Sequence, residues 1–294
     1  MTGRVYLHVG PPKTATTSLQ TAMEAIEHSG YAYAGVLQPR DRNSGTLANL
    51  LHKATLGDDG AAASLVERLR AEVSRHELVV ISEEMLSLEQ NGISTADKIE
   101  KIGTLLAEFE VVPVVTLRDP RKGLPSLFQE IHAGLPLGLQ LSFAAFCASG
   151  YAKCYDYGAL KDLLAAIGFG SARWLDFTRI TQGALTTGDV FGSGDLWNDA
   201  RLSVPRLNVS VQSASGEREL PRVSARAIGR NPLVRRVIDG MGLRGTRLTR
   251  TLGGIADRLS LDRMRSPALE VPEDCLNSLL PGYLAIVRET QDRA

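Results

Sequence analysis

The stretch Val9-Gly10-Pro11-Pro12-Lys13-Thr14-Ala15-Thr16-Thr17-Ser18-Leu19-Gln20 decides the fold of this chain. The apolar run before it, residues 4–9, predicts a buried parallel strand. Behind it, apolar side chains recur at helical spacing, at Leu19, Ala22, Met23 and Ile26. The sequence therefore predicts a strand, a tight loop and a helix in that order.

This loop has the composition of a phosphate-binding site. Backbone N–H groups and the helix dipole favour an anion at a helix start, and Lys13 adds a full positive charge. We therefore expect the loop to bind phosphate through Pro12, Lys13, Thr14, Ala15, Thr16, Thr17 and Ser18. The alternative is an ordinary helix start, rich in Ser and Thr, with a solvated Lys13.

The loop departs from the standard nucleoside-triphosphate pattern, G-x-x-x-x-G-K-[ST]. Lys13 follows Gly10 by three residues, and no Gly precedes it. The order Pro-Lys-Thr-x-Thr-Thr-Ser instead resembles the 5′-phosphosulfate loop of sulfotransferases that use 3′-phosphoadenosine 5′-phosphosulfate. Many members of that family have Gly where this chain has Ala15. Because Ala adopts a positive φ only at a cost, we expect an ordinary right-handed turn at Ala15.

Length and composition narrow the class of protein. The 294 residues can form one large α/β domain or two smaller ones. The 33 basic and 33 acidic residues balance, which argues against a general nucleic-acid binder. The three Cys have no metal-ligand spacing, which indicates a reduced compartment without a disulfide framework. The chain enters its first strand at once and has no membrane-spanning apolar run, so we expect a cytoplasmic enzyme without a signal peptide.

The pattern along the chain predicts a parallel sheet. Apolar strands at 78–81 and 111–117 alternate with amphipathic helices at 61–75 and 95–109, and a strand at 171–177 follows a helix at 157–167. Such alternation predicts an α/β, P-loop-like three-layer fold with a central, mostly parallel sheet flanked by helices. Ligands then bind beyond the carboxyl ends of the strands.

Two more strand ends carry polar side chains that should meet the Lys13 loop in one crevice. Arg118 ends the 111–117 strand, and its spacing to Ser126 resembles the 3′-phosphate motif of the same family. Asp119 and Pro120 form a good helix start, whereas Pro125 is expected to kink or restart the helix. The alternative for Arg118 is a structural ion pair.

Glu83 and Glu84 directly follow the 78–81 strand, and either carboxylate could act as a general base. Consecutive strand residues face opposite sides, so only one should enter the crevice. The resemblance places the family's Glu at Glu84, with Glu83 the second choice and capping of the next turn the alternative. We expect His8 to be a hydrogen-bonded core histidine. His52 and His132 are crevice candidates that carry no motif.

We expect two regions: an α/β core at 1–215, and a mostly helical C-terminal extension at 216–294 that packs on it. The segment 206–265 is rich in Arg and free of Lys. We interpret it as a solvated helical face, the alternative being a surface for anionic acceptors or peripheral membrane contact. Within it, Asn208-Val209-Ser210 resembles an Asn-x-Ser element of sulfotransferases.

The resemblance spans about residues 4 to 210 and is strongest to the bacterial branch that begins His-x-Gly-Pro-Pro-Lys-Thr. It implies sulfuryl transfer from 3′-phosphoadenosine 5′-phosphosulfate to a hydroxyl of a small molecule, saccharide or glycolipid, leaving 3′,5′-adenosine bisphosphate. Lys13 would neutralise the leaving oxygen, Arg118 and Ser126 would hold the 3′-phosphate, and Glu84 would deprotonate the acceptor, without a metal. The acceptor pocket is expected at residues 40–43 and 132–145.

Two other classes remain open. A P-loop kinase or nucleoside triphosphatase would need Mg²⁺ and a Walker-type loop, which this order of residues does not provide. A non-catalytic nucleotide-binding module would retain the loop and lose the acceptor base, yet Glu83 and Glu84 are both present.

Overall fold

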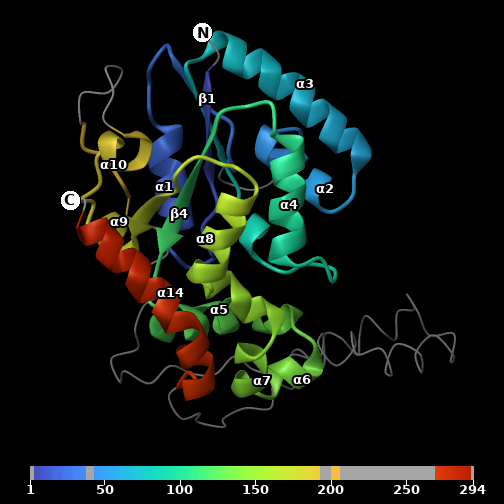
Figure 1. Ribbon diagram of the computed structural model, residues 1–294, viewed down its shortest axis with the longest axis vertical. Coiled ribbons are helices and arrows are strands. Elements are labelled where there is room, and N and C mark those ends of the chain that lie inside the picture. The colour runs from blue at the N-terminus through green and yellow to red at the C-terminus, as the bar shows by residue number, and fades with distance from the viewer. Residues whose placement is uncertain (1–2, 38–42, 193–199, 206–268, 293–294) are drawn as a thin grey trace, which may run out of the picture. The chain divides into compact units, whose positions relative to one another are not determined.

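The computed structural model describes residues 3–37, 43–192, 200–205 and 269–292 (Figure 1). Five strands form one all-parallel sheet in the order β2-β3-β1-β4-β5. The strands are β1 (Arg4–His8), β2 (Tyr31–Tyr33), β3 (Leu78–Ser82), β4 (Val111–Leu117) and β5 (Arg173–Asp176). The α/β class and the parallel sheet that the sequence predicts are therefore confirmed.

The inner strands are apolar because helices cover both of their faces. Every residue of β3 is buried, and β1 pairs with it from Arg4↔Leu78 to His8↔Ser82. On its other side β1 pairs with β4. In this pairing Pro113 lies opposite Leu7. The pairing of β4 with β5 on the other side begins one residue later, at Val114, which is consistent with the missing N–H of Pro113.

Helices lie on both faces of this sheet. On one face, α1 (Thr16–Glu24), α9 (Phe177–Thr181) and α10 (Thr187–Phe191) enclose a core that includes Tyr6, Met23 and Phe191. On the other, α2 (Leu47–Thr55) and α3 (Asp59–Arg75) pack on β3, α2 contacts α4 (Thr95–Leu105), and α4 contacts α8 (Tyr157–Ala166). In Figure 1 these groups lie to either side of β1. The sheet is thus the middle of three layers.

A glycine pair brings the last helix, α14 (Glu273–Gln291), against α8. A Cβ atom at Gly282 would lie 2.6 Å from the backbone N of Gly158 and 2.8 Å from its Cα, so the backbones pass closer than any side chain permits. Tyr283 packs on Tyr157 with ring centroids 6.0 Å apart, and Lys161 pairs with Glu289 at 2.6 Å.

Several elements differ from the sequence-based expectation. The sequence does not predict strand β2, because Tyr31 is buried but Ala32 and Tyr33 are only half-buried, which leaves no buried run. Helix α5 (Pro120–Ile131) continues through Pro125, so of the kink and the restart expected there the restart is wrong. Helix α4 ends at Leu105 rather than near Phe109. The remaining short elements are η2 (Glu84–Ser87), η3 (His132–Gly134), α6 (Leu137–Gln140), α7 (Phe143–Cys147) and η4 (Gly150–Tyr155).

Contacts divide the chain into two compact units. One comprises residues 1–120, 153–209 and 277–294 and contains the sheet, and the other comprises 121–152 and 210–276. The predicted boundary at 215/216, the Asn208-Val209-Ser210 element and the Arg-rich segment up to residue 265 lie outside the described residues, as do residues 40–42 of the predicted acceptor loop. Among the described helices, none combines the length and the apolar character needed to cross a membrane.

Candidate functional site

The loop between β1 and α1 has an unusual backbone. Lys13 and Ala15 have φ angles of 69° and 64°, although neither is glycine. Thr14 between them does not share this conformation, so left-handed residues alternate with others up to the helix start. The right-handed turn expected at Ala15 is therefore wrong. Alternation of this kind aims successive N–H groups at one point and forms an anion-binding concavity.

Ala15 also lies at the start of α1, where polar caps are common. It is the N-cap residue, and its side chain makes no capping hydrogen bond. A left-handed non-glycine residue costs of order 1–3 kcal/mol and persists only where surrounding contacts impose it, most often at functional sites. Two such residues in three positions single out this loop.

Buried hydrogen bonds impose the conformation. The Thr14 hydroxyl donates to the Pro11 carbonyl at 2.6 Å and also pairs with the Thr116 hydroxyl of β4. The Tyr155 hydroxyl donates to the Pro12 carbonyl at 2.9 Å. Thr14 is fully buried, so its hydroxyl supports the loop from within, and phosphate binding by its backbone N–H stays a prediction. The sequence does not predict that Thr116 and Tyr155 support this loop, and only the fold identifies that role.

Gly10 is required by close packing beneath the loop. A Cβ atom there would overlap the Thr116 Oγ1 atom and lie 3.0 Å from Thr16 Cγ2 and 3.1 Å from His8 Nε2. The Gly10 carbonyl in turn accepts a hydrogen bond from the Ser87 hydroxyl at 3.1 Å. The loop is thus fixed from the β3 side as well as from the β4 side.

Arg118 lies beside the loop, as predicted. Its guanidinium donates to the Lys13 carbonyl and stacks on the Phe177 ring, 4.4 Å from the centroid. Its backbone N–H donates to the Tyr157 hydroxyl at 2.9 Å. A planar guanidinium held in this way presents a fixed fork of donors. Ser126 lies in α5, within the second compact unit, so its pairing with Arg118 stays a prediction.

The two glutamates after β3 have separate roles in the structure. The Thr16 hydroxyl, at the first position of α1, donates to Glu84 Oε2 at 2.6 Å, so this half-buried carboxylate lies at the loop. Glu83 is 5 % exposed, and its Oε1 accepts the Met85 N–H at 2.9 Å as the cap of η2. Glu84 is therefore the carboxylate that contacts the start of α1 through Thr16, and Glu83 is the one that caps the turn.

A polar network lies under the loop. His8 Nδ1 and Ser82 Oγ are 2.7 Å apart, and Gln20 Nε2 donates to the same Ser82 hydroxyl at 3.1 Å. His8 has no exposed surface, and burial lowers its pKa to about 4, so it is a neutral core histidine, as expected. His132 is also buried, in the other unit, where burial lowers its pKa. His52 hydrogen-bonds Gln90 Oε1 at 2.9 Å.

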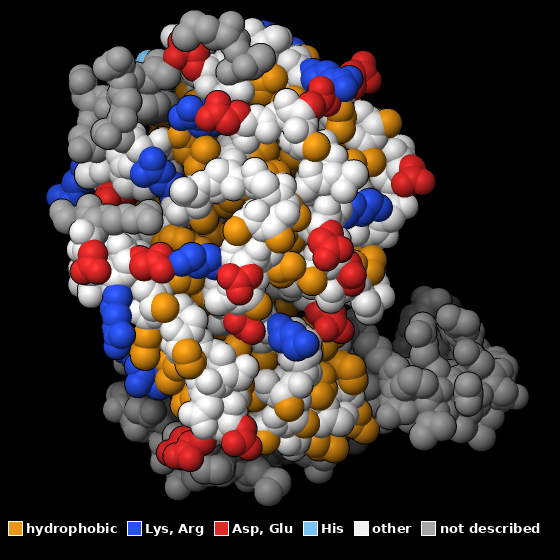
Figure 2. Space-filling view, viewed as in Figure 1, with side chains coloured by type: hydrophobic (Ala, Val, Ile, Leu, Met, Phe, Trp, Pro, Cys, Tyr) orange, Lys and Arg blue, Asp and Glu red, His pale blue; other side chains and the backbone are white. Residues whose placement is uncertain are grey.

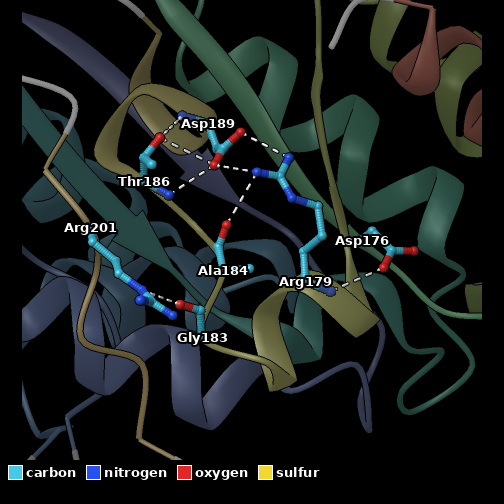
Figure 3. Close-up of polar contacts among 7 residues, drawn as sticks. All are labelled: Asp176, Arg179, Gly183, Ala184, Thr186, Asp189 and Arg201. Atoms are coloured by element: carbon cyan, nitrogen blue, oxygen red, sulfur yellow. Dashed lines mark hydrogen bonds and ion pairs between the residues drawn. The ribbon is translucent and has the colours of Figure 1, made fainter.

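A second polar cluster lies near the end of β5 (Figure 3). Arg179 makes a two-pronged ion pair with Asp189, at 2.9 and 2.8 Å, and Asp189 also accepts the Thr186 N–H at 2.8 Å. A cavity of about 430 Å³ lies beside it, lined by β5, α9, α10 and α14. Because these charges neutralise one another, we interpret the cluster as a structural ion pair that joins α9 to α10.

The surface charge is mixed. In Figure 2, acidic and basic side chains of the described residues alternate over the visible face, without one large basic patch. No group of three or more His, Cys, Asp or Glu side chains in the described part of the chain is arranged to hold a metal ion. No protein-family model matches this chain, and no curated protein matches its sequence.

Proposed function

We propose that this protein transfers a sulfuryl group from 3′-phosphoadenosine 5′-phosphosulfate to a hydroxyl of a saccharide, glycolipid or small molecule. The observation that carries the proposal is the paired left-handed conformation of Lys13 and Ala15 immediately before α1. That backbone suits a tetrahedral anion, because its N–H groups converge with the positive end of the helix dipole. The order of its residues is the one that resembles the phosphosulfate loop.

The neighbouring side chains support the same chemistry. Lys13 would neutralise the negative charge that develops on the phosphate oxygen when its bond to sulfur breaks. The backbone N–H groups of residues 14–18 and the hydroxyls of Thr17 and Ser18 would hold the 5′-phosphate. The Thr14 hydroxyl is excluded from this set because Pro11 and Thr116 engage it.

Glu84 would act as the general base. As the acceptor oxygen forms its bond to sulfur, Glu84 would take the hydroxyl proton, and the bond from sulfur to the phosphate oxygen would break. Its 2.6 Å hydrogen bond with Thr16 supports this role, because it lies next to the residues that would hold the leaving phosphate. Positioning and charge neutralisation by the protein would supply most of the rate enhancement.

Arg118 would serve the nucleotide in two ways. With Ser126 it would donate to the 3′-phosphate, because guanidinium and phosphate geometries match. Its bond to the Lys13 carbonyl also supports the loop itself. Loss of Arg118 should therefore weaken binding of the whole bisphosphate.

Binding calorimetry tests the proposal without knowledge of the acceptor. We expect 3′,5′-adenosine bisphosphate to bind the full chain more tightly than ATP with Mg²⁺. Lys13→Ala and Arg118→Ala should each weaken binding about 10–100-fold, the loss expected for charge-assisted hydrogen bonds. The control Arg70→Ala removes an exposed guanidinium that pairs with Glu108 on the surface, and it should leave the affinity unchanged.

Other outcomes would assign the chain to one of the two alternative classes of protein. Preference for ATP with Mg²⁺ would refute the proposal and favour a P-loop kinase or nucleoside triphosphatase. Tight bisphosphate binding with no ³⁵S transfer from labelled donor to any saccharide, glycolipid or phenol in an acceptor panel would favour a non-catalytic nucleotide-binding module.

A further inference from the structure

Lys98, on α4, is a buried charge that no sequence motif identifies. Its side chain has no exposed surface, and its ammonium makes three hydrogen bonds. It donates to the Met85 carbonyl at 2.8 Å, the Leu88 carbonyl at 2.7 Å and Gln90 Oε1 at 2.7 Å. Lysine is almost never fully buried unless its charge is compensated, so this residue has a specific role.

Two of the three partners of Lys98 belong to the turn that carries Glu84. Met85 lies in η2, Leu88 is its C-terminal cap, and Gln90 follows two residues later. An ammonium at the C-terminal carbonyls of a helical turn is favourable, because those carbonyls carry partial negative charge. Burial lowers the pKa of Lys98 to about 8, and the nearby Glu83 and Glu89 oppose that shift.

Two buried charges of opposite sign hold the backbone of Met85. Its N–H donates to Glu83 Oε1 at 2.9 Å, and its carbonyl accepts from Lys98 Nζ at 2.8 Å. Met85 directly follows Glu84, so this arrangement fixes the peptide from which the Glu84 side chain departs. Glu84 then reaches the loop through its bond with Thr16.

Neutral hydrogen bonds complete the attachment of η2. The Ser87 hydroxyl donates to the Gly10 carbonyl, and the Thr95 hydroxyl of α4 donates to the Ser87 carbonyl at 2.8 Å. The turn is therefore tied to the loop on one side and to α4 on the other. Among the described groups that bond to the backbone of Met85, Lys98 and Glu83 are the two that carry a charge.

We propose that Lys98 and Glu83 form a charge clamp on Met85 that sets the position of Glu84 against the Lys13 loop. Lys98 is then a positioning residue, which acts on Glu84 through the backbone. The statement that Lys98 positions a general base rests on the proposed function. The statement that Lys98 fixes the contact between Glu84 and Thr16 rests only on the geometry described above.

A double-mutant cycle in two backgrounds separates positioning from simple stabilisation. Thr16→Val, Glu84→Ala and their combination measure the coupling between the two side chains from the unfolding equilibrium. In the otherwise unaltered chain we expect coupling of about tenfold in that equilibrium constant, the size of a charge-assisted hydrogen bond. In the Lys98→Met background we expect it to fall to nearly onefold, because Glu84 no longer meets Thr16.

The matched control is Lys101→Met, one turn along α4, which removes the same charge from a residue that makes none of these contacts. It should leave the coupling at about tenfold. Lys98→Met takes away a positive charge near the buried Glu83 carboxylate, and the variant could unfold for that reason alone. The double variant Glu83→Gln with Lys98→Met therefore removes both charges together. This double background should also lose the coupling.

Coupling that survives in both Lys98 backgrounds would overturn the clamp and leave Lys98 a stabilising residue. Calorimetry with 3′,5′-adenosine bisphosphate on the same variants tests the function separately. We expect unchanged affinity in the double background, because neither Lys98 nor Glu83 is among the residues proposed to hold the bisphosphate. If the unaltered chain does not bind the bisphosphate while the coupling behaves as expected, the clamp stands and the function assigned to Glu84 falls.

Discussion

Replacing Gly10 by Ala tests how the loop is built. The new Cβ atom would overlap Thr116 Oγ1 and lie within 3.0 Å of Thr16 Cγ2. Thr116 must then rotate away and break its hydrogen bond with Thr14, a loss of about 1 kcal/mol. Overpacking adds about 1–3 kcal/mol, so we expect Gly10→Ala to lower the free energy of unfolding by about 2–4 kcal/mol.

The second site of the test is Thr116. Thr116→Ala removes the overlapping oxygen, and the Thr14 hydroxyl keeps its bond to the Pro11 carbonyl. In that background Gly10→Ala should cost only about 1 kcal/mol, since the remaining contacts are tight but not overlapping. Urea unfolding followed by circular dichroism, with equal m values for all variants, gives the four free energies.

The control is Gly138→Ala, because a Cβ atom at Gly138 meets nothing within 4 Å and Gly138 lies in helix α6. This change should be neutral or stabilise slightly. If Gly10→Ala costs the same with and without the Thr116 hydroxyl, steric conflict with Thr116 is not what requires glycine, and our account of the loop is refuted.

Three more predictions concern pH, catalysis and helix packing. Burial lowers the pKa of His8 from 6.5 to about 4, so between these pH values only the unfolded chain binds a proton at His8. The free energy of unfolding should therefore fall on acidification from pH 6.5 towards 4, by roughly 3 kcal/mol for this group. His8→Asn should remove that part of the pH dependence in thermal unfolding. Glu84→Gln should lower the rate of ³⁵S transfer to the best acceptor of the panel about 10²–10⁴-fold at unchanged bisphosphate affinity. Gly282→Ala should cost about 1–3 kcal/mol, because its Cβ would press on the Gly158 backbone.

Each of these has an outcome that contradicts it. An identical pH slope in the His8 variant would show that this histidine is not held neutral by burial. Full turnover in Glu84→Gln with normal nucleotide binding would remove the base assignment. For the helix contact, Leu284→Ala on α14 changes an exposed side chain and serves as the control, and equal stability losses in the two variants would contradict the backbone contact.

The strand–loop–helix order and the parallel sheet are readable from the sequence because they depend on local apolar runs. Strands β3 and β4 are continuous hydrophobic segments, and only burial on both faces makes such segments favourable. Strand β2 lacks this signal, since a three-residue edge strand depends on its neighbour β3 rather than on its own composition. Helix α5 likewise continues past Pro125, against the local preference, where Leu124, Leu127 and Phe128 are buried.

For the candidate site, the sequence by itself determined that Lys13, Glu84 and Arg118 follow strands whose carboxyl ends share one edge, because parallel pairing aligns those ends. Only the tertiary structure decided the rest. The left-handed Ala15 is disfavoured locally and is imposed by hydrogen bonds from Thr116 and Tyr155, which are distant in sequence. The different roles of Glu84 and Glu83, and the clamp formed by Lys98, likewise depend on contacts between elements. No spacing along the chain encodes such contacts.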